Sequence, residues 1–395
     1  MVTASHNPKW DNGYKVYWSN GAQIKSPVDK GIAASIMKNL KPWEGSWDLS
    51  TLDSSPLLKD PLAEMMVEYF KDMQVLNGSK LIEHVPKDKY PKFVYTAVHG
   101  VGLKYAEASF KSFDLPPFFP VEEQAHPDPE FSTVKYPNPE EGPDTLELSF
   151  KTADAKGATV VLANDPDADR FAVAEKQAAT GKWRIFTGNQ LGAMLGYWNW
   201  LVFKLHNEKV NPADCYMLHS TVSSRILQSI ASKEGFKVEE TLTGFKWMGN
   251  RADELMQEGK KVVFAFEEAI GFMCGTNVLD KDGVSAMGLG AQMIIYAYDK
   301  YGSLAGFLDF IFAEYGYHLT MNSYFLCYDQ EVIKALFDRI RYSKGDQSLN
   351  PELSFPEKCG QYKIKGIRDL TVGFDSLMEN NIPVSSCFIL KTKKW

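Results

Sequence analysis

The chain has 395 residues, of which 44% are hydrophobic, and its 43 basic and 50 acidic residues give a net charge of −7. A chain of this length and apolar content can bury a large core and is expected to divide into two to four domains. The excess of negative charge argues against a nucleic acid as the main partner. Five scattered cysteines without a C-x-x-C pair indicate neither a zinc site nor a disulfide framework, and they fit a reducing, cytosolic setting.

The first predicted elements are short. A Ser-His-Asn-Pro turn places Ser5 on a loop, because only a few residues of strand can precede it. Residues 14–18 alternate as a strand, and Asn20-Gly21 predicts a hairpin. The region from about 27 to 70 predicts two helical pieces with a Pro/Ser-rich break between them.

From Phe93 onward the chain repeats a strand, a loop and a helix, which predicts parallel sheets with right-handed crossovers. Strands are expected at residues 93–96, 158–163, 171–175, 183–186, 216–218, 237–239, 262–266 and about 319–327. Helices are expected at about residues 103–113, 144–155, 226–233, 283–298, 304–314 and 330–343. Two more are expected, one capped by residues 187–189 with an apolar stripe that reaches Trp198, and one that follows the stretch 243–246 and ends at about Glu258. The uncharged run at 283–298 is too short for a membrane span and is expected to be a buried helix.

Three aspartates follow the apolar run at 158–163. Asp165, Asp167 and Asp169 alternate with small or rigid residues, and in an extended loop residues i, i+2 and i+4 point the same way. Each pair of carboxylates about 4 Å apart repels by roughly 4 kcal/mol at an effective dielectric constant near 20. A hard dication removes this repulsion, and oxygen-only ligands suit Mg²⁺. The pattern therefore predicts a magnesium site at the end of a strand.

Other interpretations of the aspartate run have different requirements. An acidic surface turn needs no ligand at all. An EF-hand loop starting at Asp165 needs glycine at its sixth position and glutamate at its twelfth, where the chain has Arg170 and Lys176, so it is excluded. A phosphatase with Asp165 as nucleophile and Asp167 as acid usually has threonine where Asp169 stands, and such a hydrolase remains an alternative.

Five loops follow predicted strands: those at Ser5, His99, Asp165, Thr243 and Glu267. Ligands on such sheets gather at the carboxyl ends of the strands, so these loops could share one cleft. A serine in that cleft can carry a phosphoryl group if a metal neutralises the charge and a neighbouring group handles protons.

Four motifs occur in order along the chain, namely Thr3-Ala4-Ser5-His6-Asn7-Pro8, Asp165-Pro166-Asp167-Ala168-Asp169-Arg170, Thr243-Gly244-Phe245-Lys246 and Glu267-Glu268-Ala269-Ile270-Gly271. This set resembles the α-D-phosphohexomutase superfamily. The longer matches at residues 11–23 and 239–250 resemble its eukaryotic type 2 phosphoglucomutase branch, which includes phosphopentomutases and glucose-1,6-bisphosphate synthases. The resemblance covers nearly the whole chain.

The resemblance implies an enzyme that interconverts the 1-phosphate and the 6- or 5-phosphate of glucose, ribose or deoxyribose. Ser5 would be the phosphoserine, and glucose 1,6-bisphosphate or an equivalent would be the activator. His6 and Lys15 would be the general acid and base. The ligands of Mg²⁺ would be Ser5, Asp165, Asp167 and Asp169. Substrate would be bound by Arg170, Thr243, Gly244, Lys246, Glu267 and Lys281, although the family often has serine where Ala269 stands.

The resemblance also implies successive mixed, largely parallel α/β/α sandwich domains of the phosphohexomutase type. We expect a partial first domain with the phosphoserine loop, a second with the Asp loop, a third with the sugar-binding loops and a remnant that leads toward a missing phosphate-binding fourth domain, at residues 1–85, 86–210, 211–325 and 326–395. In the family, the fourth domain binds the substrate phosphate. Without about three charge-assisted hydrogen bonds to that phosphate, the free energy of substrate binding is less favourable by on the order of 4–9 kcal/mol. We therefore expect this chain to be weakly active or inactive.

Two alternatives to a mutase share these loops, a non-catalytic sugar-phosphate-binding remnant and a glucose-1,6-bisphosphate synthase. In each case the expected partners are small sugar phosphates. We expect neither a nucleic acid nor a membrane as a partner, and we expect a monomer in the cytosol.

Overall fold

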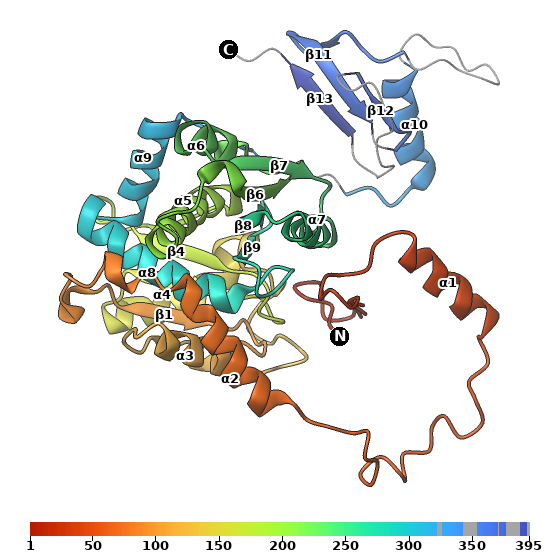
Figure 1. Cartoon of the computed structure of the whole chain (residues 1–395), viewed down its shortest axis with the longest axis horizontal. Helices are drawn as coiled ribbons and strands as arrows, with labels where there is room; N and C mark the ends of the chain where they lie inside the picture. The colour runs from red at the N-terminus through yellow and green to blue at the C-terminus, as the bar shows by residue number, and fades with distance from the viewer. Residues whose placement is uncertain (322–325, 343–353, 370, 377–387, 393–395) are drawn as a thin grey trace. The chain divides into compact units, whose positions relative to one another are not determined.

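The structure is a computed structural model that describes residues 1–321, 326–342, 354–369, 371–376 and 388–392. The chain divides into two compact units, Met1–Thr320 and Met321–Trp395. The first unit contains two mixed β-sheets with helices packed on them, and the described residues of the second form an antiparallel sheet and one helix (Figure 1). No helix in the described ranges is long and apolar enough to cross a membrane.

The first sheet has the strand order β2-β1-β3-β4-β5. Its strands are β1 (Phe93–Thr96), β2 (Phe119–Pro120), β3 (Val160–Ala163), β4 (Ala172–Lys176) and β5 (Trp183–Ile185). β1, β2 and β3 are parallel to one another. β4 pairs antiparallel with β3, and β5 pairs antiparallel with β4. The parallel strands are connected through α3 (Leu103–Ser112) and α4 (Pro143–Lys156). Gly157, with φ +63°, ends α4 in the left-handed conformation that glycine adopts without strain.

The second sheet has the strand order β7-β6-β8-β9. Its elements are β6 (Cys215–Ser220), α6 (Ile226–Glu234), β7 (Lys237–Thr241), α7 (Phe245–Gln257), β8 (Lys261–Glu267) and β9 (Gly271–Cys274). β6, β7 and β8 are parallel, and β9 pairs antiparallel with β8. β9 was not expected from the sequence, because a four-residue strand that begins at glycine is recognisable only through its pairing with β8.

Three apolar helices complete the larger unit: α5 (Gly188–His206), α8 (Gly283–Tyr301) and α9 (Leu304–Tyr315). α5 begins with a capping box between Thr187 and Gln190 and contains the buried side chains Trp198 and Trp200. α8 is buried along most of its length, as its uncharged sequence predicts. One hydrophobic core includes residues of both sheets and of these helices.

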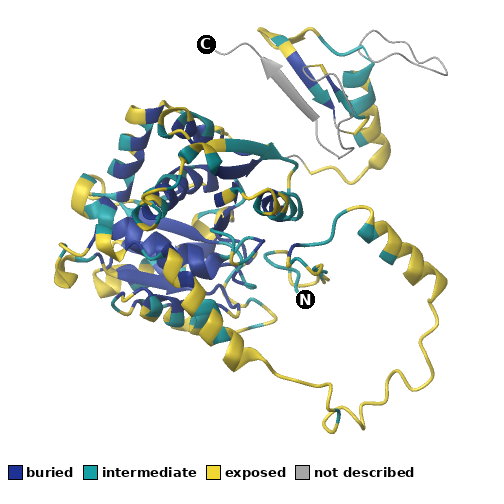
Figure 2. Cartoon of the chain, in the orientation of Figure 1, coloured by how far each residue is buried: buried dark blue, intermediate teal, exposed yellow. Residues whose placement is uncertain are grey.

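The N-terminal seventy residues carry little regular structure. They contain α1 (Val28–Lys38) and α2 (Leu62–Asp72), and neither helix has a buried residue (Figure 2). The predicted strand at 14–18 is only a pair of isolated bridges, because no neighbouring strand extends the Asn20-Gly21 hairpin into a sheet. Short 3₁₀ helices elsewhere span Met73–Leu76 (η1), Ser79–Leu81 (η2), Lys87–Lys89 (η3), Glu122–Gln124 (η4), Pro139–Glu141 (η5) and Pro212–Asp214 (η6).

Within its described residues, the second unit contains α10 and four strands, at Gln330–Arg341 (α10), Lys358–Cys359 (β10), Tyr362–Asp369 (β11), Phe374–Asp375 (β12) and Phe388–Thr392 (β13). β11 pairs antiparallel with the other three strands. Arg341 donates from Nε to Asp369 Oδ2 at 2.6 Å and so connects α10 to β11. The strand expected at 319–327 is absent at 319–321 and 326–327, and its remainder lies outside the described residues.

The predicted mixed α/β/α architecture is therefore confirmed. Each sheet is parallel in its first part and antiparallel at its edge. The proposed domain boundaries remain predictions.

Candidate active site

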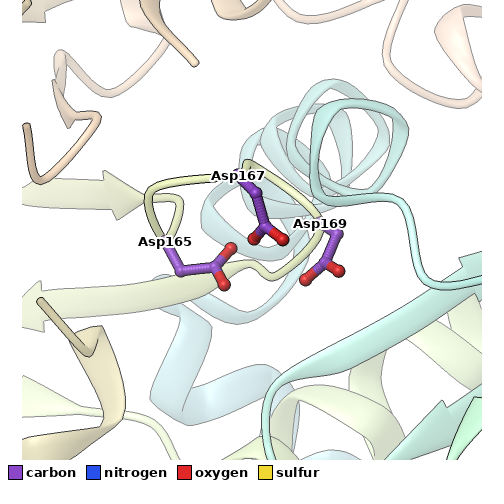
Figure 3. A group of neighbouring side chains, drawn as sticks. All are labelled: Asp165, Asp167 and Asp169. Atoms are coloured by element: carbon purple, nitrogen blue, oxygen red, sulfur yellow. The ribbon is translucent and has the colours of Figure 1, made fainter. Parts of the chain in front are cut away.

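The loop between β3 and β4 brings the three predicted aspartates together. One carboxylate oxygen of each of Asp165, Asp167 and Asp169 lies within 4.8 Å of the others. Figure 3 shows the three side chains directed from one loop toward a common space. Asn164 closes the loop by donating from Nδ2 to the carbonyl oxygen of Arg170 at 2.6 Å.

Packing from neighbouring segments holds this loop in place. The Tyr95 hydroxyl donates to Asn164 Oδ1 at 2.8 Å, and the amide of Val101 donates to the Pro166 carbonyl at 2.9 Å. Gly100 lies so close that an added Cβ would be 2.3 Å from Pro166 Cα.

The other side of the loop contacts the second sheet, because the Phe171 amide donates to the carbonyl oxygen of Ile270 in the turn before β9. The loop is therefore clamped between the two sheets.

Electrostatics at this loop fit a hard cation. Burial, followed by repulsion from Asp169 and Asp167, raises the pKa of Asp165 well above its usual value. The buried Oδ1 atoms of Asp167 and Asp169 have no hydrogen-bond partner among the described residues. Three convergent carboxylates, two of them with an unsatisfied oxygen, form a donor set that suits Mg²⁺.

Ser5 lies against the aspartates although 160 residues separate it from Asp165. Its Oγ donates to Asp165 Oδ2 at 2.8 Å and lies 3.1 Å from His6 Nδ1. Its φ of +56° is unusual for a residue other than glycine, and backbone strain of this kind concentrates at functional sites. The Thr3 hydroxyl accepts from the Ser5 amide at 2.9 Å and donates to Asp167 at 3.2 Å, which stabilises this conformation.

His6 and Lys15, the predicted acid and base, both lie at this site. Burial, reinforced by the charge of Arg170, lowers the pKa of His6 to about 4, so the imidazole is neutral near pH 7. Lys15 donates to Asp167 Oδ2 at 2.8 Å and to Asp169 Oδ2 at 2.9 Å. Burial alone would lower the pKa of Lys15, but these carboxylates raise it, so the ammonium remains charged.

Lys281 approaches from the segment before α8. Its Nζ lies 2.9 Å from Asp169 Oδ2 and 3.6 Å from Asp280 Oδ1. Asp280 also accepts from the Tyr17 hydroxyl at 2.9 Å and from Gln23 Nε2 at 3.0 Å. Asp280 thus fastens the N-terminal hairpin beside Lys281.

Arg170 and Glu267 face each other behind the aspartates. Arg170 donates from Nη1 to the carbonyl oxygen of Ala269 at 2.7 Å, and its Nη2 lies 4.0 Å from Glu267 Oε1. The Arg170 Nε is buried without a hydrogen-bond partner among the described residues. Burial raises the pKa of Glu267 despite the nearby Arg170 and Lys281. Arg170 Nε also lies 3.8 Å from Asp165 Oδ2 and 3.9 Å from Asp169 Oδ1, so Arg170 connects Glu267 to the aspartates.

The predicted sugar-binding loop with Thr243, Gly244 and Lys246 lies near the aspartates, although among the described residues no hydrogen bond or ion pair joins it to them. It forms the start of α7, where Gly244 has φ +104°. The Phe245 ring lies 5.8 Å from Lys281 Nζ, which brings this loop next to the site. The described contacts do not join Thr243 or the Lys246 side chain to the aspartates.

A cleft of about 590 Å³ opens at Asp167, Asp169 and Lys281, and its other wall is the apolar face of α2, including Met65 and Tyr69. Of the five loops that were expected to share one cleft, the Asp loop lines this cleft, and the loop at His99 reaches it through Val101. Ser5, Thr243 and Glu267 are not among its lining residues.

Three residues at the site were missed as functional positions by sequence reasoning. Thr3 connects the Ser5 amide with Asp167, Asn164 closes the Asp loop, and Asp280 anchors the hairpin. Thr3 is the first residue of one recognised motif and Asn164 directly precedes another, which is a usable signal. Asp280 owes its role to Tyr17 and Gln23, more than 250 positions away, and no local pattern indicates that.

Comparisons with known proteins agree with this geometry. Profiles described as phosphoglucomutase/phosphomannomutase, alpha/beta/alpha domains I, II and III, match residues 1–42, 68–181 and 188–308. The phosphopentomutase of Homo sapiens is 55% identical over 376 residues, which is 95% of this chain and 60% of that protein. The glucose 1,6-bisphosphate synthase of Homo sapiens is 47% identical over 389 residues, 98% of this chain and 61% of that protein. The chain therefore spans about 60% of the length of the curated relatives it matches.

Solved structures share the fold at low sequence identity. A phosphoglucomutase/phosphomannomutase family protein from Burkholderia thailandensis superposes with a TM-score of 0.53 at 16% identity, covering 78% of this chain and 57% of that chain. The N-acetylphosphoglucosamine mutase of Aspergillus fumigatus, solved with GlcNAc-6P and magnesium, has a TM-score of 0.50 at 16% identity, covering 80% of this chain and 72% of that chain. The chain belongs to the phosphoglucomutase/phosphomannomutase family, within the α-D-phosphohexomutase superfamily.

Proposed function

We propose that the chain carries the phosphoserine and metal-binding parts of a Mg²⁺-dependent mutase, which moves a phosphoryl group between position 1 and position 6 or 5 of a sugar. The observation that carries this proposal is the 2.8 Å contact between Ser5 Oγ and Asp165 Oδ2. A nucleophilic hydroxyl and a cluster of metal-ligating carboxylates at one point are the parts that phosphoryl transfer needs. The phosphopentomutase and glucose 1,6-bisphosphate synthase relatives support the sugar-phosphate class.

Ser5, Asp165, Asp167 and Asp169 would hold Mg²⁺. When bound, the ion would neutralise the charge of the phosphoryl group near Ser5. Arg170 and Lys281 would pair with phosphate oxygens, and Glu267 would accept from sugar hydroxyls. Thr243, Gly244 and Lys246 would contact the sugar and its distal phosphate.

Protons would be handled by His6 and Lys15. When Ser5 takes a phosphoryl group, the Oγ–P bond forms and the sugar O–P bond breaks. The Oγ proton, which is donated to Asp165 Oδ2 in the structure, would turn to His6 Nδ1 and pass to it. This nitrogen lies 3.1 Å away and is unprotonated near pH 7 because the pKa of His6 is about 4. The charged Lys15 would supply a proton to the leaving sugar oxygen.

Intact-mass measurement tests this proposal. After incubation with Mg²⁺ and glucose 1,6-bisphosphate, the chain should gain one phosphate, and Ser5→Ala should gain none. Equal phosphate uptake by Ser5→Ala would refute the role of Ser5. No uptake by the wild-type chain would favour the non-catalytic sugar-phosphate-binding remnant. Free phosphate release that survives Ser5→Ala would favour the hydrolase that uses Asp165.

A glucose-1,6-bisphosphate synthase is the second candidate, because the human synthase is 47% identical to 98% of this chain. Accumulation of the bisphosphate far beyond the amount of enzyme, from glucose 1-phosphate and a phosphoryl donor, would favour it over a mutase. In either case we propose a cytosolic monomer whose partners are sugar phosphates.

A further inference from the structure

A second large cavity lies away from the proposed active site. It has a volume of about 780 Å³, within the usual range for small-molecule sites, and lies between η1, the end of α5, the start of β8 and the residues after β9. β8 runs from Lys261 at this cavity to Glu267 near the aspartates. At about 3.3 Å per residue, the two ends are roughly 20 Å apart. The cavity is therefore a separate site.

The charge of the lining differs from that of the chain. The chain has more acidic than basic residues, whereas the lining of this cavity contains Lys260, Lys261 and His206 and neither aspartate nor glutamate. Lys260 is paired with Asp214 at 2.8 Å. The Lys261 ammonium has no ion pair or hydrogen bond within the described part of the chain. The cavity therefore offers an uncompensated positive charge.

The carbonyl end of α5 also reaches the cavity and would disfavour an anion if left uncovered. Asn207 covers it, because its amide donates to the Lys204 carbonyl and its Nδ2 donates to the Phe203 carbonyl at 2.9 Å. Asn277 is similarly fixed, since its Nδ2 donates to the Asp72 carbonyl at 2.8 Å. These polar residues are held by the framework and need little reordering on binding.

The deeper walls are apolar. Leu76, Val202, Val262 and Val263 are buried residues that line the cavity. Gly275, with φ +76°, completes this wall, and a Cβ added there would be 3.1 Å from Leu76. Apolar surface inside and lysine charge in the lining together select a ligand with two chemically different ends.

We propose that this cavity binds an amphipathic anion, a small phosphorylated or carboxylated compound with an apolar body. The apolar body would lie on the valine and leucine wall, and the anionic group would pair with Lys261. This proposal does not depend on the reaction at Ser5.

Titration with 1-naphthyl phosphate tests the proposal, with binding to the whole chain followed by calorimetry. We expect one binding event, and at least tenfold weaker binding of a naphthyl probe that carries an ammonium in place of the phosphate. Lys261→Glu should weaken naphthyl phosphate binding at least tenfold. Lys237→Glu changes the net charge equally at an exposed lysine outside the cavity, so it should leave the affinity unchanged. Circular dichroism would verify that both variants fold.

The variant Lys281→Met distinguishes probe binding in this cavity from probe binding at the proposed active site. If the probe is bound in the second cavity, Lys281→Met leaves its affinity unchanged. Loss of affinity in Lys281→Met but not in Lys261→Glu would place the probe beside the aspartates and overturn the proposal. Equal affinity for the anionic and cationic probes, equal effects of Lys261→Glu and Lys237→Glu, or no binding at millimolar probe would also overturn it.

Discussion

The Asp loop and the Ser5 loop meet at one site but are built in different ways. The Asp loop is embedded in the core, with Asn164 and Asp165 fully buried and Gly100 in close contact with Pro166. Among residues 1–72, all of which are described, only Ala22 is buried (Figure 2). The Ser5 loop is held mainly by polar side-chain contacts with residues that lie far away in the sequence.

This difference separates two tasks. Packing fixes the carboxylates where mutual repulsion would otherwise drive them apart, so the aspartate cluster should be present even without its ligand. The Ser5 loop is positioned by charge, since Lys15 bonds to Asp167 and Asp169 and Ser5 bonds to Asp165. Substitutions in the core should therefore change stability, and charge substitutions should change ligand affinity and the position of the Ser5 loop.

The largest expected effect follows from removing a carboxylate charge from the cluster. Asp167→Asn should weaken Mn²⁺ binding, used as a probe for Mg²⁺, at least about a hundredfold, or roughly 2.7 kcal/mol, because ligand charge sets the affinity of such sites. Calorimetry on the whole chain measures this. Asp128→Asn, a carboxylate on another loop, is the control and should bind as wild type. Unchanged Mn²⁺ affinity in Asp167→Asn would show that the cluster is not the metal site.

A second substitution tests whether packing fixes the Asp loop. Gly100→Ala would place a methyl group 2.3 Å from backbone atoms of Pro166, so the backbone must move. We expect the free energy of unfolding to fall by about 2–3 kcal/mol. Thermal denaturation measures the loss.

Gly13→Ala is the matched substitution beside the Ser5 loop. A methyl group at Gly13 would be 1.8 Å from the Thr3 carbonyl oxygen and would displace the Ser5 loop. Because none of residues 1–21 is buried, global stability should change by less than about 0.5 kcal/mol, while limited proteolysis before residue 28 becomes faster. If Gly13→Ala lowered the melting temperature as much as Gly100→Ala, the two regions would unfold together and the comparison would fail.

Substitution of Lys15 tests how charge affects metal binding and the position of the Ser5 loop. Its ammonium occupies oxygens of Asp167 and Asp169 that a metal ion also needs. Lys15→Met should therefore tighten Mn²⁺ binding about tenfold, or roughly 1.4 kcal/mol, and should also loosen the N-terminal segment. Lys25→Met, which removes a lysine paired with Glu254, serves as the control and should have no effect. Weaker Mn²⁺ binding in Lys15→Met would instead show that the lysine supports the metal site.

The same division explains how far the sequence alone could be interpreted. The Asp loop was predictable because alternating aspartates after a buried strand form a local pattern, and the strand β3 positions them. The predicted strand at 14–18 failed because alternation gives no information about whether a partner strand exists. The contact between Lys281 and Asp169 joins positions 112 residues apart, and only the packing of β9 and α8 brings them together. Local spacing predicted the cluster of carboxylates, whereas tertiary structure supplied the surrounding cations.

A final expected effect is a pH-dependent contribution of Glu234, away from the site, to the free energy of unfolding. Glu234 ends α6 and accepts hydrogen bonds from Trp200, Lys204 and Tyr315, each at 2.8 Å. Burial alone would raise the pKa of Glu234, but these donors lower it below its ordinary value of 4.5. A carboxylate with a lowered folded-state pKa adds stability above the unfolded pKa, and this stability is lost as the pH falls through the folded pKa.

Glu234→Gln should therefore lower the free energy of unfolding by about 1 kcal/mol at pH 7, a value discounted for partial solvent screening. The difference from wild type should shrink as the pH falls below about 4.5, which denaturant titrations at several pH values would measure. Glu314→Gln, which removes an exposed partner of Lys233, should change stability little at any pH. If the difference in the free energy of unfolding between wild type and Glu234→Gln stayed constant down to pH 3, the charge of Glu234 would not be its source.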